Sequence, residues 1–196
     1  GDAPATLLDS YEIERSAAAD ENIRASTRST DFIAPHSAQE RRMRQAVLRL
    51  AKETEFAKRM VNGGRLSTPS TYESPLSTPD SDVWAAGPRP GAHMIDAPLA
   101  TESGDPIYLT EAFRQGGGGF VLLRSGAGDN GLPGCHSISI GEATPLRDTS
   151  GLFSKRYDVS DGAAYLLRPD GYVAARFRQP TRAALDAALA RATGHI

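Results

Sequence analysis

The hydrophobic pattern of this chain changes once, from helical to β, and that change limits the folds it can adopt. Before Asn62, apolar side chains recur at three- and four-residue steps, which is typical of helices. After Gly91 they form short continuous runs or alternate with polar residues, which is typical of strands. A segment rich in Ser, Thr and Pro lies between. We therefore expect a helical segment over 1–62, a linker over 63–90 that wraps over a surface, and an α/β domain over 91–196.

Two helices are expected in the first part. The first covers residues 4–28, because the helical pattern ends ahead of Pro35, and proline disfavours helix in the residue before it. The second begins after Ser37, which precedes Glu40 by the spacing of a capping box. Its apolar stripe is Met43, Val47, Leu50, Thr54, Ala57 and Val61. The pattern predicts a hairpin of two packed helices, and a dimerising coiled coil is the alternative.

The β pattern is clearest in three places. Residues 120–123 form a continuous apolar run that predicts a central buried strand, and residues 138–140 alternate like a half-buried one. Two β-prone runs within residues 164–177 flank Pro169 and Gly171, which predicts a hairpin with a three-residue loop and a left-handed glycine. Residues 181–193 close the chain as a helix.

Composition excludes several classes of function. The chain has 22 basic and 24 acidic residues and a net charge of −2, which predicts no nucleic-acid partner. No apolar run is long enough for a membrane helix, and the first residues do not resemble a secretory signal. The chain has 1 cysteine, so an internal disulfide is impossible, and a reducing cytoplasm is the expected location.

Residues 126–131 match the G-x-G-x-x-G pattern of dinucleotide-binding loops. That motif works only where the loop opens a helix whose N-terminus holds the pyrophosphate. Here Pro133 and Gly134 follow directly, and the next apolar pattern has the period of a strand. We therefore expect a flexible loop without a nucleotide.

Cys135 and His136 are neighbours, which raises the possibility of a thiol enzyme. Neighbouring side chains of a strand point to opposite faces, so the two should not share a proton. The other histidines are His36, His93 and His195, and their scatter gives no metal-ligand spacing. From the residues alone we predict no catalytic residue, no cofactor-binding residue and no metal ligand.

Several segments nevertheless occur in a familiar order. They resemble the C-terminal portion of FAD-dependent aromatic hydroxylases, the branch that includes phenol and hydroxyphenylpropionate hydroxylases and polyketide- and rifamycin-modifying monooxygenases. The segment 167–176, Leu-Arg-Pro-Asp-Gly-Tyr-Val-Ala-Ala-Arg, is the most specific of them. The others are residues 7–15, 30–32, 61–67, 72–76, 87–91 and 96–99.

The resemblance implies a C-terminal fragment in which residues 1–62 are the end of the flavin and substrate region of the parent. It also implies that the domain over 91–196 is thioredoxin-like and lacks redox cysteines. It implies FAD and NAD(P)H for the full-length parent and no cofactor in this chain, because the flavin motifs lie upstream of it. The implied role is structural or oligomerisation-related, with the upstream flavin domain as partner and a homodimer as a further possibility. The family's helix after the first strand of this domain is expected to be shortened here, because glycines and Pro133 occupy its place. The alternative hypothesis is a free-standing, redox-silent thioredoxin-like module that binds another protein.

Overall fold

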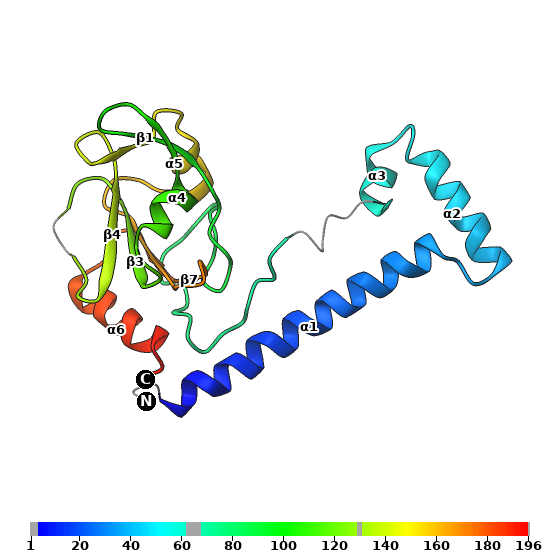
Figure 1. Cartoon of the computed structure of the whole chain (residues 1–196), viewed down its shortest axis with the longest axis horizontal. Helices are drawn as coiled ribbons and strands as arrows, with labels where there is room; N and C mark the ends of the chain where they lie inside the picture. The colour runs from blue at the N-terminus through cyan, green and yellow to red at the C-terminus, as the bar shows by residue number, and fades with distance from the viewer. Residues whose placement is uncertain (1–3, 62–67, 129–130, 196) are drawn as a thin grey trace. The chain divides into compact units, whose positions relative to one another are not determined.

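The computed structural model describes residues 4–61, 68–128 and 131–195 (Figure 1). Its contacts form two compact units. The first, here called the β unit, comprises Gly1–Glu14 and Thr71–Ile196, and the second, here called the arm unit, comprises Arg15–Ser70. The division into 1–62, 63–90 and 91–196 stays a prediction about domain organisation. Among the described residues, no helix is both long and apolar enough to span a bilayer.

The β unit is built on a mixed sheet of seven strands in the order β2-β1-β5-β4-β3-β6-β7. The predicted central strand is confirmed as β3, which runs parallel to β4 and antiparallel to β6. Both edges of β3 are therefore paired, and Val121, Leu122 and Leu123 are all buried, which agrees with its continuous apolar sequence. The strands are β1 (Pro98–Thr101), β2 (Pro106–Tyr108), β3 (Phe120–Ser125), β4 (Cys135–Ile140), β5 (Leu146–Arg147), β6 (Ala164–Leu167) and β7 (Val173–Phe177).

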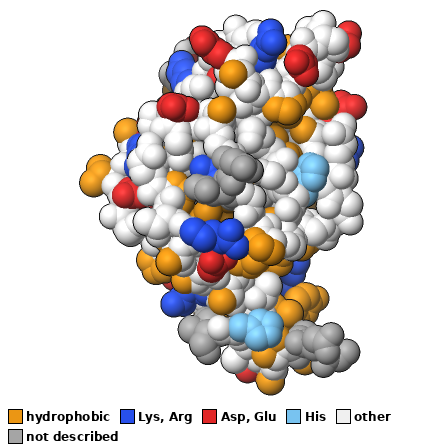
Figure 2. All heavy atoms as spheres, turned by 90° about the vertical axis from the view of Figure 1, so that its left-hand side faces the viewer, with side chains coloured by type: hydrophobic (Ala, Val, Ile, Leu, Met, Phe, Trp, Pro, Cys, Tyr) orange, Lys and Arg blue, Asp and Glu red, His pale blue; other side chains and the backbone are white. Residues whose placement is uncertain are grey.

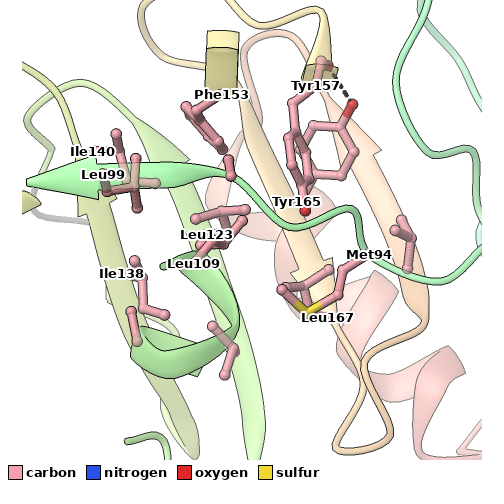
Figure 3. Packing of buried hydrophobic residues seen from close by; sticks show 14 residues of the cluster. Met94, Leu99, Leu109, Leu123, Ile138, Ile140, Phe153, Tyr157, Tyr165 and Leu167 are labelled. Atoms are coloured by element: carbon pink, nitrogen blue, oxygen red, sulfur yellow. Dashed lines mark hydrogen bonds between the residues drawn. The ribbon is translucent and has the colours of Figure 1, made fainter. Parts of the chain in front are cut away.

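Helices cover both faces of this sheet. Val121 and Leu123 of β3 point to the face that carries α4 (Leu109–Arg114) and α5 (Leu152–Tyr157). Leu122 points to the opposite face, which carries α6 (Arg182–Ala192). Figure 3 shows the first of these two cores, where Tyr165 donates a hydrogen bond to the carbonyl of Tyr157. The period-two alternation of side chains thus produces two separate hydrophobic clusters.

The hairpin and the closing helix are confirmed. Strands β6 and β7 pair antiparallel, and the amide of Gly171 donates to the carbonyl of Arg168 at 2.9 Å. Gly171 has a φ of 81°, in the left-handed region expected for the end of a three-residue loop. The closing helix α6 begins after Thr181, whose hydroxyl accepts from the amide of Ala184.

The outer edge of β7 is covered by the chain that precedes β1. The amide of Thr78 donates to Ala174 at 2.7 Å, and the amide of Gly91 donates to Val173 at 2.8 Å. Tyr72, on the same stretch of chain, is 5% exposed. This segment is therefore an ordered wrap along the sheet, and its backbone supplies partners that an edge strand otherwise lacks.

The helices of the first 61 residues differ from the predicted ones. Helix α1 (Ala5–Ile33) continues five residues beyond the predicted end and stops just before Ala34, the residue that Pro35 restricts. The capping box of Ser37 and Glu40 is present at the start of α2 (Ala38–Leu50). The prediction of one helix up to residue 61 is wrong, because α2 ends at Leu50 and α3 (Glu55–Val61) begins separately.

The cause of that break is the side chain of Thr54. Its hydroxyl donates to the carbonyl of Leu50 at 3.1 Å and accepts from the amide of Ala57 at 3.4 Å. A threonine that hydrogen-bonds locally in this way competes with the helical backbone and starts a new helix. The helical spacing of the apolar residues continues across the turn, so periodicity alone does not reveal it.

The predicted hairpin of two packed helices is not formed. Helix α2 packs against α3, and none of its residues is buried. In α1 the buried residues are Ser10 and Glu14, both in its first half. The apolar stripe of α2 is narrow, and the arginines on the rest of this helix leave little apolar surface to hold α1 along its length.

Candidate functional site

The glycine loop lies at the carboxyl end of β3, where ligands often bind in parallel sheets. The amide of Gly126 donates to the carbonyl of Ile140 at 2.7 Å. Gly126 has a φ of 89°, in the left-handed region that favours glycine. Residues 126–128 and 131–134 contain no helix, and residues 129–130 lie outside the described part of the chain. The described loop therefore lacks the helix N-terminus that a pyrophosphate requires.

A hollow of about 710 Å³ opens beside this loop, at the ends of β3 and β4. Asp148 is one of the acidic residues that line this hollow, and its carboxylate accepts several hydrogen bonds. Its Oδ2 atom accepts from the amide and the hydroxyl of Ser154, each at 2.8 Å, and its Oδ1 atom accepts from the amide of Phe153 at 3.3 Å. The Asp148 carboxylate thus satisfies backbone amides at the start of α5.

Cys135 and His136 do not form a catalytic pair in this geometry. Cys135 packs against the cluster under α6, whereas His136 is exposed on the other face, beside Gly116. Burial raises the pKa of the Cys135 thiol. A raised pKa leaves less thiolate at neutral pH, which is the opposite of what a nucleophile needs.

The remaining histidines lie apart from one another. His93 contacts the ring of Tyr172 edge to face at 5.2 Å, and its Nδ1 atom lies 2.9 Å from the carbonyl of Met94. In the arm unit, His36 faces Asp31 across 3.9 Å. His195 lies 3.1 Å from the hydroxyl of Thr193. Within the described residues, no group of three or more His, Cys, Asp or Glu side chains could hold a metal ion.

The structure instead brings together charged residues that join the start of α1 to the β6–β7 loop. Glu14 is 4% exposed, and its carboxylate receives both terminal nitrogens of Arg168, at 2.6 Å and 3.0 Å. Arg168 also donates to Asp170 at 2.9 Å. Burial alone would lower the pKa of Arg168, but the hydrogen bond to Glu14 and the two acidic charges outweigh it and raise that pKa. We call Glu14, Arg168 and Asp170 the helix anchor.

The helix anchor lies beside an apolar hollow of about 460 Å³. Leu7, Leu76 and Phe120 line it, together with residues at the end of α6. The hydroxyl of Thr6 donates to the carbonyl of Gly194 at 2.8 Å, so the first turn of α1 lies against the end of α6 (Figure 1). The helix anchor and the hydrogen bond of Thr6 together fix the beginning of α1.

A second charged cluster holds the wrapping segment. Arg176 of β7 binds both carboxylate oxygens of Asp80, at 2.9 Å and 2.7 Å. The guanidinium carbons of Arg176 and Arg178 lie 4.6 Å and 3.8 Å from the ring centroid of Trp84. Arg178 also pairs with Asp158 at 2.6 Å. We call these residues the tryptophan clamp, and their cation–π contacts and ion pairs fasten residues 80–86 onto the β unit.

Comparison with known proteins identifies the family. The profile of the C-terminal domain of aromatic-ring hydroxylases matches residues 87–195, which is more than half of the chain. The chain belongs to the aromatic-ring hydroxylase family. The segment 167–176, on which the sequence resemblance chiefly depended, lies within the matched region, so that resemblance is confirmed.

The curated relative that this chain matches is much longer than the chain. A 4-methyl-5-nitrocatechol 5-monooxygenase of Burkholderia sp is 28% identical over 203 residues, which cover 91% of this chain and 33% of the relative. The chain thus spans about a third of the curated relative that it matches. Its homologues are flavin-dependent monooxygenases, and it corresponds to their C-terminal part.

Solved structures show the same fold. The flavin-dependent monooxygenase PieE, in complex with FAD and substrate, has a TM-score of 0.70 and 22% identity, covering 99% of this chain and 41% of PieE. The ternary complex of aklavinone-11 hydroxylase with FAD and aklavinone has a TM-score of 0.67 and 22% identity, covering 99% of this chain and 36% of that hydroxylase. At these identities the likeness establishes the fold alone.

Sequence reasoning singled out both halves of the helix anchor but did not join them. Glu14 lies in the segment 7–15 and Arg168 in the segment 167–176, which are far apart along the chain. The one hint in the sequence is the charge of the two residues: Glu14 in the first segment is acidic, and Arg168 in the last segment is basic. Sequence reasoning did not join Trp84 to Arg176 and Arg178, the arginines of the tryptophan clamp.

Proposed function

We propose that this chain is the C-terminal part of an FAD-dependent aromatic-ring monooxygenase, and that its own role is structural rather than catalytic. The observation that carries the proposal is the match of residues 87–195 to the C-terminal domain of aromatic-ring hydroxylases. The relative from Burkholderia sp supports the reaction class, since its name describes a monooxygenase acting on a nitrocatechol ring. The substrate class proposed for the parent is accordingly an aromatic compound.

The structural role is supported by how the charged groups of the chain are used. Arg168, Arg176 and Arg178 all hold one segment of this chain against another. The thiol of Cys135 is held protonated by burial, which raises its pKa. The ion pairs of these three arginines therefore hold α1 and the wrapping segment on the β unit. This arrangement suits a domain that positions other parts of the parent.

FAD and NAD(P)H are proposed for the parent and not for this chain. When bound, the flavin supplies the redox chemistry that ring hydroxylation requires. The described part of the glycine loop does not fit a dinucleotide, because no helix follows it in residues 126–128 and 131–134. A cytoplasmic location belongs to the same proposal, on the ground that the chain has 1 cysteine.

A thioredoxin-like core is the finer proposal for the β unit. Its support is the order β4-β3-β6-β7, in which β3 and β4 are parallel and β6 and β7 follow as an antiparallel hairpin. Helix α6 covers one face of these four strands. The crossover from β3 to β4 lacks a helix in its described residues, which is the departure that the glycines and Pro133 predicted.

The native reading frame tests the proposal. We expect it to continue upstream of Gly1 into a flavin-binding region, and the complete protein to carry FAD and to consume NAD(P)H when an aromatic substrate is added. The chain of 196 residues should be colourless and should retain no flavin through gel filtration. Stoichiometric flavin on this chain alone, or a start codon immediately before Gly1, would overturn it. The second result would favour the free-standing binding module.

A further inference from the structure

The apolar hollow beside the helix anchor has the size and the lining of a small-molecule site. Its volume of about 460 Å³ lies within the range of ligand pockets in proteins, roughly 300 to 1,000 Å³. Apolar side chains form most of its walls, among them Leu7, Leu76 and Phe120. Figure 2 shows apolar side chains gathered with a histidine at the lower end of the face it presents, at the height where the start of α1 and the end of α6 lie in Figure 1. A pocket with mainly apolar walls and a few polar groups is typical of a site for a small organic molecule.

His195, which lines the hollow, supplies a hydrogen-bond acceptor to it. The hydroxyl of Thr193 donates its single proton to the end of α6, where the carbonyls of Leu189 and Ala190 lie at 2.9 Å and 3.0 Å. The oxygen of that hydroxyl therefore accepts from the Nδ1 atom of His195, which lies 3.1 Å away. With the proton on Nδ1, the Nε2 atom of the neutral imidazole carries a lone pair and accepts hydrogen bonds.

The charges beside the hollow oppose an anionic ligand. Arg168 belongs to the lining, but its guanidinium is already bound by the carboxylates of Glu14 and Asp170, at 2.6 Å and 2.9 Å. Two carboxylates and one guanidinium give the helix anchor a net charge of −1. An aromatic carboxylate in the hollow would therefore be repelled by the anchor. The ligand that suits both the apolar walls and the acceptor on His195 is an uncharged ring that carries a hydroxyl group.

We propose that this hollow is a binding site for small, neutral phenols. The ring lies between the apolar walls, where Phe120 offers an aromatic contact, and the phenolic hydroxyl donates to the Nε2 atom of His195. Because Leu7 of α1 and Ala192 of α6 both line the hollow, a bound phenol adds contacts between these helices and stabilises the folded β unit. The site needs only residues of this chain, so it goes beyond the structural role proposed above and does not depend on a flavin-binding region.

The test is a titration of the ¹⁵N-labelled chain with phenol, followed by NMR of the backbone amides at about pH 8, where imidazole side chains are neutral. We expect saturable shifts of the amides around the hollow, including those of Leu7, Phe120 and Ala192, with a dissociation constant on the order of 1 mM for a ligand this small. Two related compounds test the chemistry. Anisole keeps the ring but has no hydroxyl proton to donate, and benzoate is an anion, so each should bind several-fold more weakly than phenol.

A matched pair of variants tests the acceptor. His195→Ala removes Nε2 at an exposed position and should weaken phenol several-fold, to the strength of anisole, while anisole binds as before. His136→Ala is the control, because His136 is exposed on β4 and is not part of the lining, so phenol should bind this variant as it binds the unsubstituted chain. The amide spectrum away from the hollow reports whether each variant keeps its fold.

Four results would overturn the proposal: shifts that do not saturate, shifts centred elsewhere on the chain, equal binding of phenol and anisole, or undiminished binding of phenol to a folded His195→Ala variant. Each of them concerns this hollow alone. The proposed function fails by a different observation, a start codon immediately before Gly1 or flavin on this chain, so the two failures are distinguishable.

Discussion

Glu14 and Arg168 are the residues whose pairing matters most to this chain. Their side chains are 3% and 12% exposed, and two parallel hydrogen bonds join them. A buried ion pair contributes little net stability when intact, but loss of one partner leaves a charge that water cannot reach. The ion pair therefore holds α1 at a defined position on the β6–β7 loop.

We expect Glu14→Gln to lower the free energy of unfolding by about 3 kcal/mol, toward the lower end for a broken buried pair because Asp170 still accepts from Arg168. Chemical denaturation of the isolated chain measures the change. Asp186→Asn is the control, since Asp186 pairs with Arg182 on an exposed helix face and its loss should cost less than about 1 kcal/mol. Equal losses of unfolding free energy in the two variants would contradict the view that the buried ion pair holds α1 in place.

The sequence could not reveal this pair, although it revealed both residues. A single sequence shows which residues are charged and which lie in a helix or a turn, but contacts between distant residues depend on the completed fold. The same limit applied to Arg176 and Asp80. By contrast, the opposite orientations of Cys135 and His136 follow from strand geometry alone, so the expectation that they do not share a proton could be stated in advance.

The β6–β7 hairpin is the element that local chemistry determines most fully. Pro169 and Gly171 set its loop, and the observed φ of Gly171 is the predicted one. Five short elements, in contrast, were not predicted: β1, β2, β5, α4 and α5. The strands β1, β2 and β5 have two to four residues and no continuous apolar run, and the helices α4 and α5 have six residues, which is fewer than two helical turns.

We expect Gly171→Val to lower the free energy of unfolding by about 1–3 kcal/mol through backbone strain, with a further loss from collision with His93. A Cβ at Gly171 would lie 2.9 Å from the Nε2 atom of His93. Gly104→Val is the matched control, because Gly104 also has a positive φ, of 91°, but a Cβ there would meet nothing within 4 Å. Thermal unfolding compares the stability of the two variants. A smaller loss of stability in Gly171→Val than in Gly104→Val would show that the β6–β7 loop changes its conformation to accommodate the valine.

The wrapping segment should respond to acid through Asp158. The backbone amide of Ala85 and the Arg178 side chain hold the pKa of Asp158 below its ordinary value of 3.8. The stabilisation from this carboxylate is therefore fully present above that ordinary value and is lost as the pH falls through the lowered pKa. The fluorescence of Trp84, the 1 tryptophan in the sequence, reports whether the segment stays attached.

In Asp158→Asn we expect the Trp84 emission at neutral pH to move toward that of exposed tryptophan, and its change on acidification from neutral pH through the lowered pKa to shrink. Asp186→Asn serves again as the control and should leave both the neutral spectrum and the acid change as they are in the unsubstituted chain. An acid transition of undiminished size in Asp158→Asn would show that another carboxylate controls the attachment.

At the scale of the whole molecule, the two units differ in how much apolar surface they bury. The β unit has two closed clusters, one on each face of its sheet. Helix α2 has no buried residue, and ordering each residue costs about 1–2 kcal/mol of backbone entropy. The contacts present in α2 and α3 cannot offset that cost unless another surface covers them.

We therefore expect the amides of residues 38–61 to exchange with deuterium much faster than those of β3 and β6 in a dilute, monomeric sample of this chain. Hydrogen exchange followed by mass spectrometry gives the comparison, and α6 is the control for a helix that is packed. Protection of residues 38–61 equal to that of β3 would mean that the helices are stable on their own.

The wrap along β7 has a consequence for how the domain can be cut. The sheet has two outer strands: β2, which is three residues long and begins with Pro106, and β7, whose edge the segment before β1 occupies. A shortened chain beginning at Gly91 would keep every strand yet leave part of β7 bare, and bare strand edges recruit other chains. Light scattering should show such a truncation associating at concentrations where the chain of 196 residues stays dispersed. The segment that composition marks as a linker thus also protects the domain from aggregation.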